Sequence, residues 1–426
     1  MSLLGTGTGQ TPSAGSSAEA EALIAEARAR ARRRRQRIAV AVLSAFALAG
    51  GGLAAGGVFD GTRTATAPGG GAGGAAAVPP APPPYFMDAT SMGGGYSSPE
   101  IRASATGRLV ASTPIGSDPR LRDYDPPYGL AATGPDSFVV GLMTPSDCST
   151  QFFRFTVNGQ GRPGALTQVG PTRPGELTSM TVAAGGRLIA YVIGLSGCPK
   201  AGRGSYLGVF DPVTGRTRQW TDAPPYMSQL SMSADGRLLA FTQELTKPVH
   251  GGFQITGYQV RVLATDAAPG PLDGRSRVAA SLSPQDLQLA APAVLLSPTG
   301  TSFYLCAQPF ALPKRGAKKI TETASIVVYR TATGKATGVL AAWAESYPIN
   351  ADGSDDPPVL SCSSMALDPS GRFLLVPYLE TPGNAADPSS SGSLTAARIN
   401  TATRARSDWT VPFGAGQGQH TMSVAW

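Results

Sequence analysis

Residues that could support catalysis are few and scattered in this chain of 426 residues. There are two histidines, His250 and His420, which excludes a three-histidine zinc site and an HExxH arrangement. His420 could join a Ser-His-Asp triad, but the chain has no GxSxG elbow. Asp352, Asp355 and Asp356 could bind Ca²⁺ through clustered oxygens, yet EF-hand spacing is absent and a solvated turn is the simpler interpretation. The sequence therefore predicts no catalytic residue, metal or cofactor.

The four cysteines offer a different chemistry, because an even number favours disulfide bonds in an oxidising compartment. They are Cys148, Cys198, Cys306 and Cys362. Metal binding is disfavoured because the sequence contains no CxxC pair. Free buried thiols are the alternative interpretation. Disulfide bonds between these positions require elements that bring distant loops together.

Aromatic side chains could form a binding face without any catalytic group. Tyr124, Tyr128, Tyr226, Trp343 and Tyr347 lie in segments that lead into predicted strands. Rings at such positions supply large contact areas for a partner. Packing between neighbouring elements is the alternative interpretation of the same rings.

Two interleaved repeats predict the elements that position these residues. β-Branched or aromatic runs are broken by a turn and resume with alternating polarity, about every 50 to 70 positions. These hairpins begin at Glu100, Phe153, Leu207, Tyr258, Ile326 and Ala397, with turns at Gly107, Gly159, Gly215, Gly270, Gly334 and Thr403. A second series places the turn glycines Gly134, Gly186, Gly236, Gly300 and Gly371 before apolar strands. Together the two series give four strands per unit, which is typical of a β-propeller blade.

The two ends of the repeat region supply complementary parts of one further unit. GQHTMSVAW at the C-terminal end has the pattern of a first strand, and YFMDATS from Tyr85 has that of a second strand without a predecessor. Joined, they complete a sixth blade and leave no long free edge. The prediction is an all-β, six-bladed β-propeller over residues 85–426, closed by its N- and C-terminal strands. Adjacent loops of neighbouring blades then pair Cys148 with Cys198. Cys306 on a second strand and Cys362 on the first strand of the next blade form the other predicted pair.

The turn motifs resemble those of the TolB-like group of WD-like repeat propellers. SMSADGRLLAFT from Ser231 and MALDPSGRFLLV from Met365 match the recurring SxDGRxLAF pattern, whereas the turns at Gly134 and Gly300 lack the arginine. The resemblance covers the region of the repeats and implies a structural role for the motif. The chain as a whole resembles membrane-anchored actinobacterial proteins with such an ectodomain.

The N-terminal region predicts where the propeller lies in the cell. Residues 38–59 are uncharged and long enough to span a bilayer as one transmembrane helix. The arginine-rich residues 1–37 are expected in the cytoplasm, where the arginine run contacts anionic membrane lipid. Residues 60–84, rich in Gly, Ala and Pro, form a linker. The predicted location is the cell membrane, single-pass, with the propeller extracytoplasmic. A cleaved secretory signal or a twin-arginine signal is the alternative.

The charge distribution disfavours a nucleic-acid partner. Of the formal net charge of +7, residues 1–37 carry +4 (seven Arg minus three Glu), which leaves +3 for the remainder. A nucleic-acid-binding region needs a concentrated basic face. Only Lys314, Arg315, Lys318 and Lys319 cluster in the sequence, and they read as a solvated loop tip.

The predicted function is a membrane-anchored, non-catalytic binding or scaffolding module. The predicted partner is a protein or a cell-envelope glycan, recognised by long loops on one rim of the ring. Two alternatives are an extracytoplasmic hydrolase or lyase of the propeller type and a transmembrane signalling regulator. Convergent carboxylates in the central mouth would favour the hydrolase or lyase.

Overall fold

The computed structural model describes residues 82–92, 95–96, 99–113, 115, 121, 125–144, 146–195, 198, 204–224, 227–249, 252–283, 292–308, 319–348, 359–360, 364–381, 392–413 and 420–426. Contacts group Val78–Trp426 into one compact unit. All the described strands and hydrophobic clusters belong to this unit, so it holds the complete core of the ring. Within the described ranges no helix is long and apolar enough to cross a bilayer, and the predicted span at residues 38–59 lies outside them.

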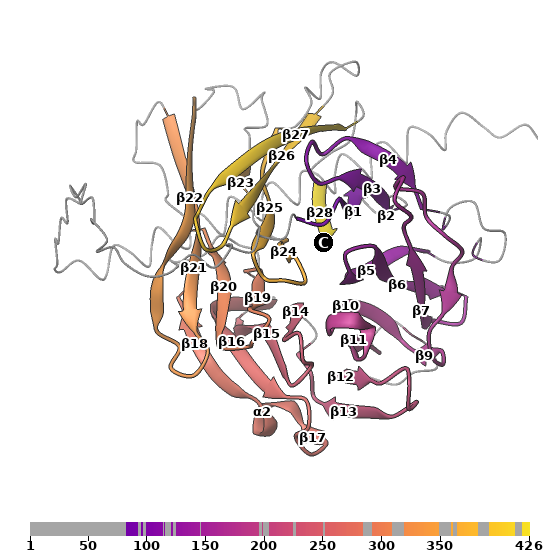
Figure 1. The fold of residues 1–426 in the computed structure, drawn as a ribbon. Coiled ribbons are helices and arrows are strands. Elements are labelled where there is room, and N and C mark those ends of the chain that lie inside the picture. Colours follow the sequence, from indigo (N-terminus) through magenta and orange to yellow (C-terminus); the bar gives the residue numbers. More distant parts are fainter. Residues whose placement is uncertain are drawn as a thin grey trace, which may run out of the picture. The chain divides into compact units, whose positions relative to one another are not determined.

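Six sheets stand as blades around a central axis (Figure 1). From the axis outward, blade 1 contains β28 (His420–Ala425), β1 (Tyr85–Met92), β3 (Glu100–Ala103) and β4 (Leu109–Ser112), with β2 (Gly95–Tyr96) beside β1. Blade 2 contains β5 (Asp125–Gly134), β6 (Ser137–Thr144), β7 (Ser149–Thr156) and β8 (Thr167–Gln168), with β9 (Arg173–Pro174) beside β7. Blade 3 contains β10 (Glu176–Val182), β11 (Ile189–Gly194), β12 (Ser205–Phe210) and β13 (Thr217–Thr221), and a 3₁₀ turn, η3 (Ala184–Gly186), joins its first two strands.

The second half of the ring follows the same order. Blade 4 contains β14 (Ser228–Met232), β15 (Leu238–Val249), β16 (Gly252–Ala264) and β18 (Arg277–Leu282), and α2 (Leu272–Arg275) lies before β18. β17 (Gly270–Pro271) comes from the same connection but pairs in parallel with β13 of blade 3. Blade 5 contains β19 (Val294–Leu296), β20 (Ser302–Ala307), β21 (Lys319–Arg330) and β22 (Ala336–Pro348). Blade 6 contains β23 (Val359–Leu360) and β24 (Ala366–Leu367), both paired with β25 (Phe373–Thr381), followed by β26 (Gly392–Asn400) and β27 (Arg406–Phe413).

The position of each strand in its blade explains its sequence pattern. Second strands are covered by a neighbouring blade on both faces, so they are apolar without alternation, as in β6 and β11. Outermost strands border solvent. In β13 only Trp220 is buried. The repeat could be recognised from the sequence because the second strand of each unit is a continuous apolar run next to a turn.

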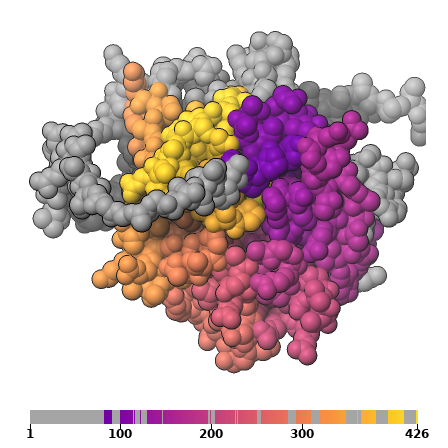
Figure 2. Space-filling view, in the orientation of Figure 1, coloured from indigo at the N-terminus to yellow at the C-terminus, as the bar shows by residue number. Residues whose placement is uncertain are grey.

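The ring closes as the sequence predicts. β28 pairs with β1 in antiparallel register from Met87 opposite Ala425 to Met92 opposite His420. The indigo N-terminal blade therefore lies beside the yellow C-terminal strands (Figure 2). Phe86, Val424 and Trp426 share a buried cluster with side chains of blade 6. The closing strand is thus held by backbone pairing in its own blade and by apolar packing on the next.

The predicted turns form, with three shifts in position. Gly107 and Gly334 have φ angles of 68° and 65°, and an added Cβ would lie 1.9 Å from the Trp409 ring and 1.7 Å from the Ala279 oxygen, respectively. Both glycines are therefore required by conformation and by close approach to another segment. In blade 2 the strand β5 continues through Gly134, and Gly161, rather than Gly159, has the positive φ of the second turn. The prediction of a hairpin turn at Gly270 is wrong, because Gly270 lies in β17.

Each blade donates a side-chain hydrogen bond to a turn of the next blade. The acceptors are carbonyl oxygens in five interfaces, reached by Tyr85 (Gly159, 2.8 Å), Arg154 (Gly186, 3.1 Å), Arg218 (Thr265, 2.7 Å), Arg277 (Thr331, 2.6 Å) and Arg398 (Ser104, 3.3 Å). Between blades 5 and 6, Tyr304 makes a side-chain hydrogen bond with Thr401. These contacts lock neighbouring blades together at the end of the strands where the tight turns lie.

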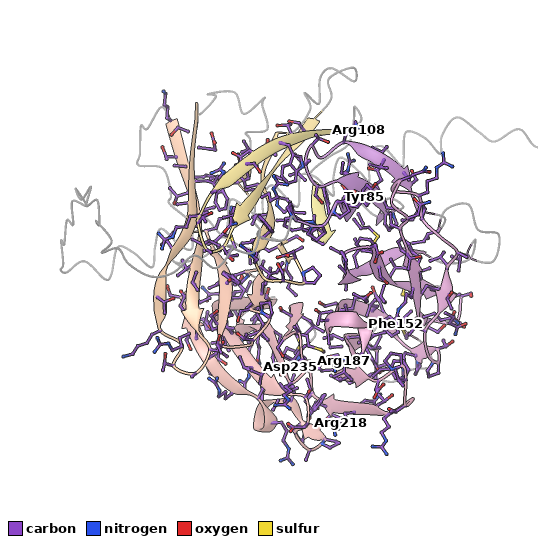
Figure 3. The ribbon with its side chains drawn as sticks, viewed as in Figure 1. Tyr85, Arg108, Phe152, Arg187, Arg218 and Asp235 are labelled. Atoms are coloured by element: carbon purple, nitrogen blue, oxygen red, sulfur yellow. A yellow bond between two sulfur atoms is a disulfide. The ribbon has the colours of Figure 1, made fainter. Side chains whose placement is uncertain are left out.

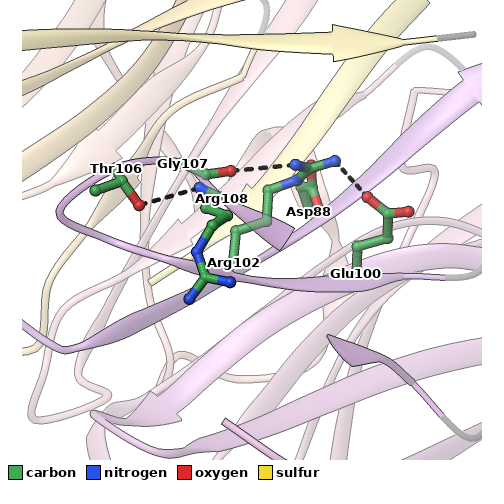
Figure 4. Close-up of polar contacts among 6 residues, drawn as sticks. All are labelled: Asp88, Glu100, Arg102, Thr106, Gly107 and Arg108. Carbon is green, nitrogen blue, oxygen red and sulfur yellow. Dashed lines mark hydrogen bonds and ion pairs between the residues drawn. The ribbon is translucent and has the colours of Figure 1, made fainter. Parts of the chain in front are cut away.

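A buried carboxylate occupies the closing blade (Figure 4). Asp88 of β1 is 2 % exposed, and its Oδ2 accepts a hydrogen bond of 2.7 Å from Nε of Arg102. Arg102 also contacts Glu100 and donates to the Gly107 oxygen. Asp88 Oδ1 is buried without a partner. Desolvation raises the pKa of Asp88 from 3.8 to about 7, although Arg102 opposes the rise.

We expect Asp88 to make the stability of the ring depend on pH. The folded chain holds this proton more tightly than the unfolded chain, so the contribution is complete below pH about 4 and is lost as the pH rises through about 7. The full shift corresponds to at most about 4 kcal/mol. Urea unfolding of wild type and Asp88→Asn at about pH 4 and about pH 8 measures it. The wild type should lose more free energy of unfolding than the variant. Glu100→Gln should lose less than wild type, because the Glu100 charge helps to raise the pKa of Asp88. A wild type and Asp88→Asn that change in parallel would contradict the assignment.

Candidate binding site in the channel and on the loop face

The ring has two chemically different faces. The turn face carries the turns between the first and second strands and between the third and fourth strands of the blades. The loop face carries the connections between second and third strands and between blades. Tyr85 begins β1 at the turn face, since its hydroxyl bonds Gly159 and since Ser104 N donates to the Pro84 oxygen. The linker therefore joins the propeller on the turn face.

A channel of about 310 Å³ lies on the axis, lined by the innermost strands of all six blades. Its polar side is formed by Thr178 and Thr181 of β10 and Gln229 of β14, none of which is buried. Leu130 of β5 and Leu295 of β19 lie on the flanking strands. Gln229 has a φ of 46°, which is strained for a side chain of this type, and it lies in an irregular stretch of β14. The channel thus offers neutral hydroxyl and amide groups beside aliphatic carbon.

Serines of the innermost strands fix the width of this channel. Ser179 Oγ accepts from the Leu230 amide at 3.1 Å, and Ser231 Oγ accepts from the Leu296 amide at 2.8 Å. Ser364 Oγ accepts from the Val424 amide at 3.2 Å. Each bond joins the first strand of one blade to the first strand of the next. The serines therefore bond neighbouring blades to each other, and the threonine and glutamine side chains line the channel.

The channel lining contains one ionisable side chain, Asp368, among the described residues. It is 4 % exposed, and its carboxylate accepts hydrogen bonds from the Ser370 and Phe373 amides at 3.2 and 2.7 Å. Asp368 therefore caps the first turn of blade 6, as the motif resemblance implies. General acid–base chemistry requires a group with a free proton acceptor near the reacting atoms. The described lining is suited to contacts with uncharged groups. The carboxylates Asp352, Asp355 and Asp356 lie outside the described residues, and no group of three metal-ligating side chains occurs within them.

On the loop face, a disulfide bond joins Cys148 to Cys198, with their Cα atoms 5.6 Å apart. This confirms the first predicted pair and links the connections between second and third strands of blades 2 and 3. Cys306 is buried in β20 and is not a free thiol. Its predicted partner, Cys362, lies outside the described residues, so that pairing stays a prediction.

Two hairpins project from the loop face. β15 and β16 remain paired to Val249 opposite Gly252, although β14 stops pairing at Thr242 and β18 at Tyr258. We call residues 243–249 and 252–257 the blade 4 ribbon. β21 and β22 remain paired to Lys319 opposite Pro348, beyond the end of β20. The blade 4 ribbon exposes Thr246 and Lys247, and Val249 is 43 % exposed.

Of the five aromatic residues predicted to form a binding face, Trp343 is the one whose side chain the structure describes. Trp343 is 5 % exposed, stacks on Tyr378 with ring centres 5.0 Å apart, and lies under the Arg406 guanidinium. Its ring packs between blades 5 and 6 instead of forming part of an exposed face. Tyr124 and Tyr226 lie outside the described residues. Tyr128 and Tyr347 lie in strands β5 and β22, but their side chains are not described.

Sequence reasoning missed the residues that shape the channel. Thr178, Gln229 and the serines that bond neighbouring blades belong to the first strands of their blades. The repeats predict these strands without assigning a role to their side chains. The signal was a polar residue inside each run, as in LTSMTV and QLSMS. A polar side chain at a position predicted to be buried between blades should bond a neighbouring strand or face the axis.

Comparisons with known proteins assign no family to the chain. No protein-family model matches the chain, and no curated protein matches it. A similar solved structure is TolB from Acinetobacter baumannii, with 12% identity, 81% of this chain and 67% of that chain covered, and a TM-score of 0.42. TolB belongs to the group whose turn motif the sequence resembles.

Enzymes occur among the similar structures too. A Bacteroides uniformis protein described as a 6-phosphogluconolactonase has 12% identity, with 79% of this chain and 99% of that chain covered and a TM-score of 0.39. A Synechocystis apocarotenoid oxygenase has 9% identity, with 76% and 70% covered and a TM-score of 0.37. Similarities of this size assign no family and no activity to this chain. The six-bladed propeller rests on the strand pairing of the chain itself.

The disulfide assignments predict a simple thiol count. Replacing both Cys148 and Cys198 by alanine should lower the free energy of unfolding by about 2–4 kcal/mol, because the cross-link restricts the unfolded chain. The variant, denatured without reductant, should show no free thiol if Cys306 and Cys362 are bonded to each other. Two thiols per chain would contradict the second pair, and an unchanged stability would show that the first cross-link does not stabilise the ring.

Proposed function

We propose that this chain is a membrane-anchored, extracytoplasmic propeller that binds a protein or envelope glycan on its loop face without catalysis. The observation that carries the proposal is the position of the linker. The chain joins the ring through Pro84 and Tyr85 on the turn face. A tether on that face leaves the loop face free for a partner in solution or in the envelope.

The form of the two faces supports this assignment. Tight turns on the turn face are bonded to neighbouring blades, for example by the Arg277 side chain, and the longer connection 265–276 of blade 4 accepts a hydrogen bond from Arg218. The loop face carries the disulfide and the projecting ribbons of blades 4 and 5. Long connections on a rigid scaffold are where binding residues are commonly found. The neutral polar groups of the channel, such as Gln229 and Thr178, extend the candidate surface to the axis.

Site-specific photocrosslinking on intact cells tests the proposal. A photoreactive residue replaces Lys247 in the exposed blade 4 ribbon, and a matched control replaces Val213, which is 85 % exposed in a turn of blade 3. Both positions are solvent-accessible, so their substitution should not disturb the core. We expect a protein or glycan adduct of defined mass from position 247 and none of that mass from position 213.

The outcome that sinks the proposal is the same adduct from position 213 with none from position 247. Adducts of equal yield from both positions would also contradict a role for the loop face. Shortening the blade 4 ribbon by removing residues 246–256 provides a second arm. This deletion lies outside the pairs of β15 with β14 and of β16 with β18, so the ring should still fold. Because the deletion removes position 247, the photoreactive residue in this arm replaces the exposed Lys319 of the blade 5 hairpin, and the adduct from position 319 should be weakened.

A further inference from the structure

Basic residues gather on the turn face, one or two in every blade. Seven of them directly follow a turn glycine, and the eighth, Arg404, itself has a positive φ of 61°. The eight turn cations are Arg108, Arg162, Arg187, Arg216, Arg237, Lys335, Arg372 and Arg404. All are exposed except Arg372, which is half-buried. The sequence did not reveal this face because its cations are spaced one per turn instead of forming a run.

Carboxylates on the same turns only partly offset these charges. The same connections contain Asp136, Asp211, Asp235, Asp266, Asp273 and Asp368, and Arg275 as a further cation, so nine cations minus six carboxylates leave +3. Asp368 is buried as a cap, and Asp211 accepts hydrogen bonds from the Val213 and Thr214 amides of its own turn. Among the described residues, Arg237 is the turn cation that forms an ion pair: its Nε lies 3.7 Å from Asp235, and its side chain is 86 % exposed.

The loop face has the opposite balance among described side chains. Its carboxylates that are not buried are Asp147, Glu176, Asp222, Glu244, Glu322 and Glu345, against the exposed cations Lys247 and Lys319. The described side chains of the two faces therefore differ in the sign of their charge balance. Figure 3 labels Arg108 and Arg187, which come from blades 1 and 3 and lie well apart around the ring. Charges spread over a flat face suit a broad anionic surface better than a small anion.

We propose that the turn face docks on the anionic surface of a lipid bilayer, with the turn cations against headgroup phosphates. Two independent observations converge on this partner, namely the basic charge of the face and the linker that joins the ring at Pro84 on the same face. A tether and a polybasic patch are the two signals that together hold a domain at a membrane. The docking orients the loop face away from the bilayer, and for this orientation it rests on the tether of the proposed function.

Docking of the turn face on the bilayer depends on many weak contacts. Each Lys or Arg near an anionic bilayer adds about 1 kcal/mol, and the attraction decays within a Debye length of about 10 Å. Because the turn cations share one face, several of them can lie within a Debye length of the bilayer surface at once. Neither Arg108 nor Arg187 makes a side-chain hydrogen bond or ion pair within the described chain, so both can turn toward lipid. Removing two such charges should weaken binding about 30-fold.

Vesicle sedimentation with residues 78–426 tests docking independently of the predicted span. This fragment holds the complete core, since every described strand lies within it. Vesicles of phosphatidylglycerol mixed with phosphatidylcholine are compared with vesicles of phosphatidylcholine alone, at low salt and at about 0.5 M NaCl. We expect binding to the anionic vesicles at low salt, loss of that binding at high salt, and little binding to the neutral vesicles.

Two charge-matched double variants locate the binding surface. Arg108→Gln with Arg187→Gln removes two turn cations, and Lys247→Gln with Lys319→Gln removes two exposed lysines of the loop face. The first pair should weaken binding to anionic vesicles about 30-fold, and the second should leave it unchanged. Equal losses from both pairs, or equal binding to neutral vesicles, would overturn the proposal. So would tight binding to duplex DNA with no binding to anionic vesicles. Failure here leaves the crosslinking result at position 247 intact, so the two proposals fail separately.

Discussion

The pairing of β28 with β1 is the constraint on which the rest of the structure depends. It brings residues from the two ends of the ring sequence into one sheet, from Met87 opposite Ala425 onward. Propeller blades present only one unpaired outer edge each when the ring is closed. Closure lets every blade have two neighbours, so each interface can hold a side-chain donor such as Arg398 on Ser104. It also places the start of β1 on the turn face, where the preceding chain enters the ring.

The closed ring has two structurally different faces. Tight turns, caps such as Asp368 and cross-blade donors such as Arg277 occupy one face, where they hold the blades in register. Longer connections, the Cys148–Cys198 bond and the projecting hairpins occupy the other. Hydrogen bonds that Ser179 and its equivalents accept from amides of the next blade join the inner strands around a narrow polar channel. A scaffold that is rigid around its circumference can vary its loops without loss of the core, which is why propellers serve many functions.

Blade number and closure could be predicted from the sequence because both depend on local patterns. Turn glycines such as Gly334 and the apolar second strands repeat along the chain. The first disulfide followed, since equivalent loops of neighbouring blades must be adjacent. Properties that depend on convergence of distant residues could not be predicted. Asp88 read as one position of an apolar strand, and nothing local placed Arg102 beside it. The sequence predicted Trp343 as part of a binding face, but from its position in β22 the ring packs against blade 6.

Hydrogen–deuterium exchange of backbone amides measures the closure most directly. In a closed ring, the amides of β1 and β28 that bond each other should exchange as slowly as those of the interior strand β11, because opening them requires separation of the first and last blades. Deletion of residues 420–426 should release the β1 amides while blade 3 stays protected. Fast exchange of β1 and β28 in the intact chain, comparable to that of an exposed turn, would contradict the account.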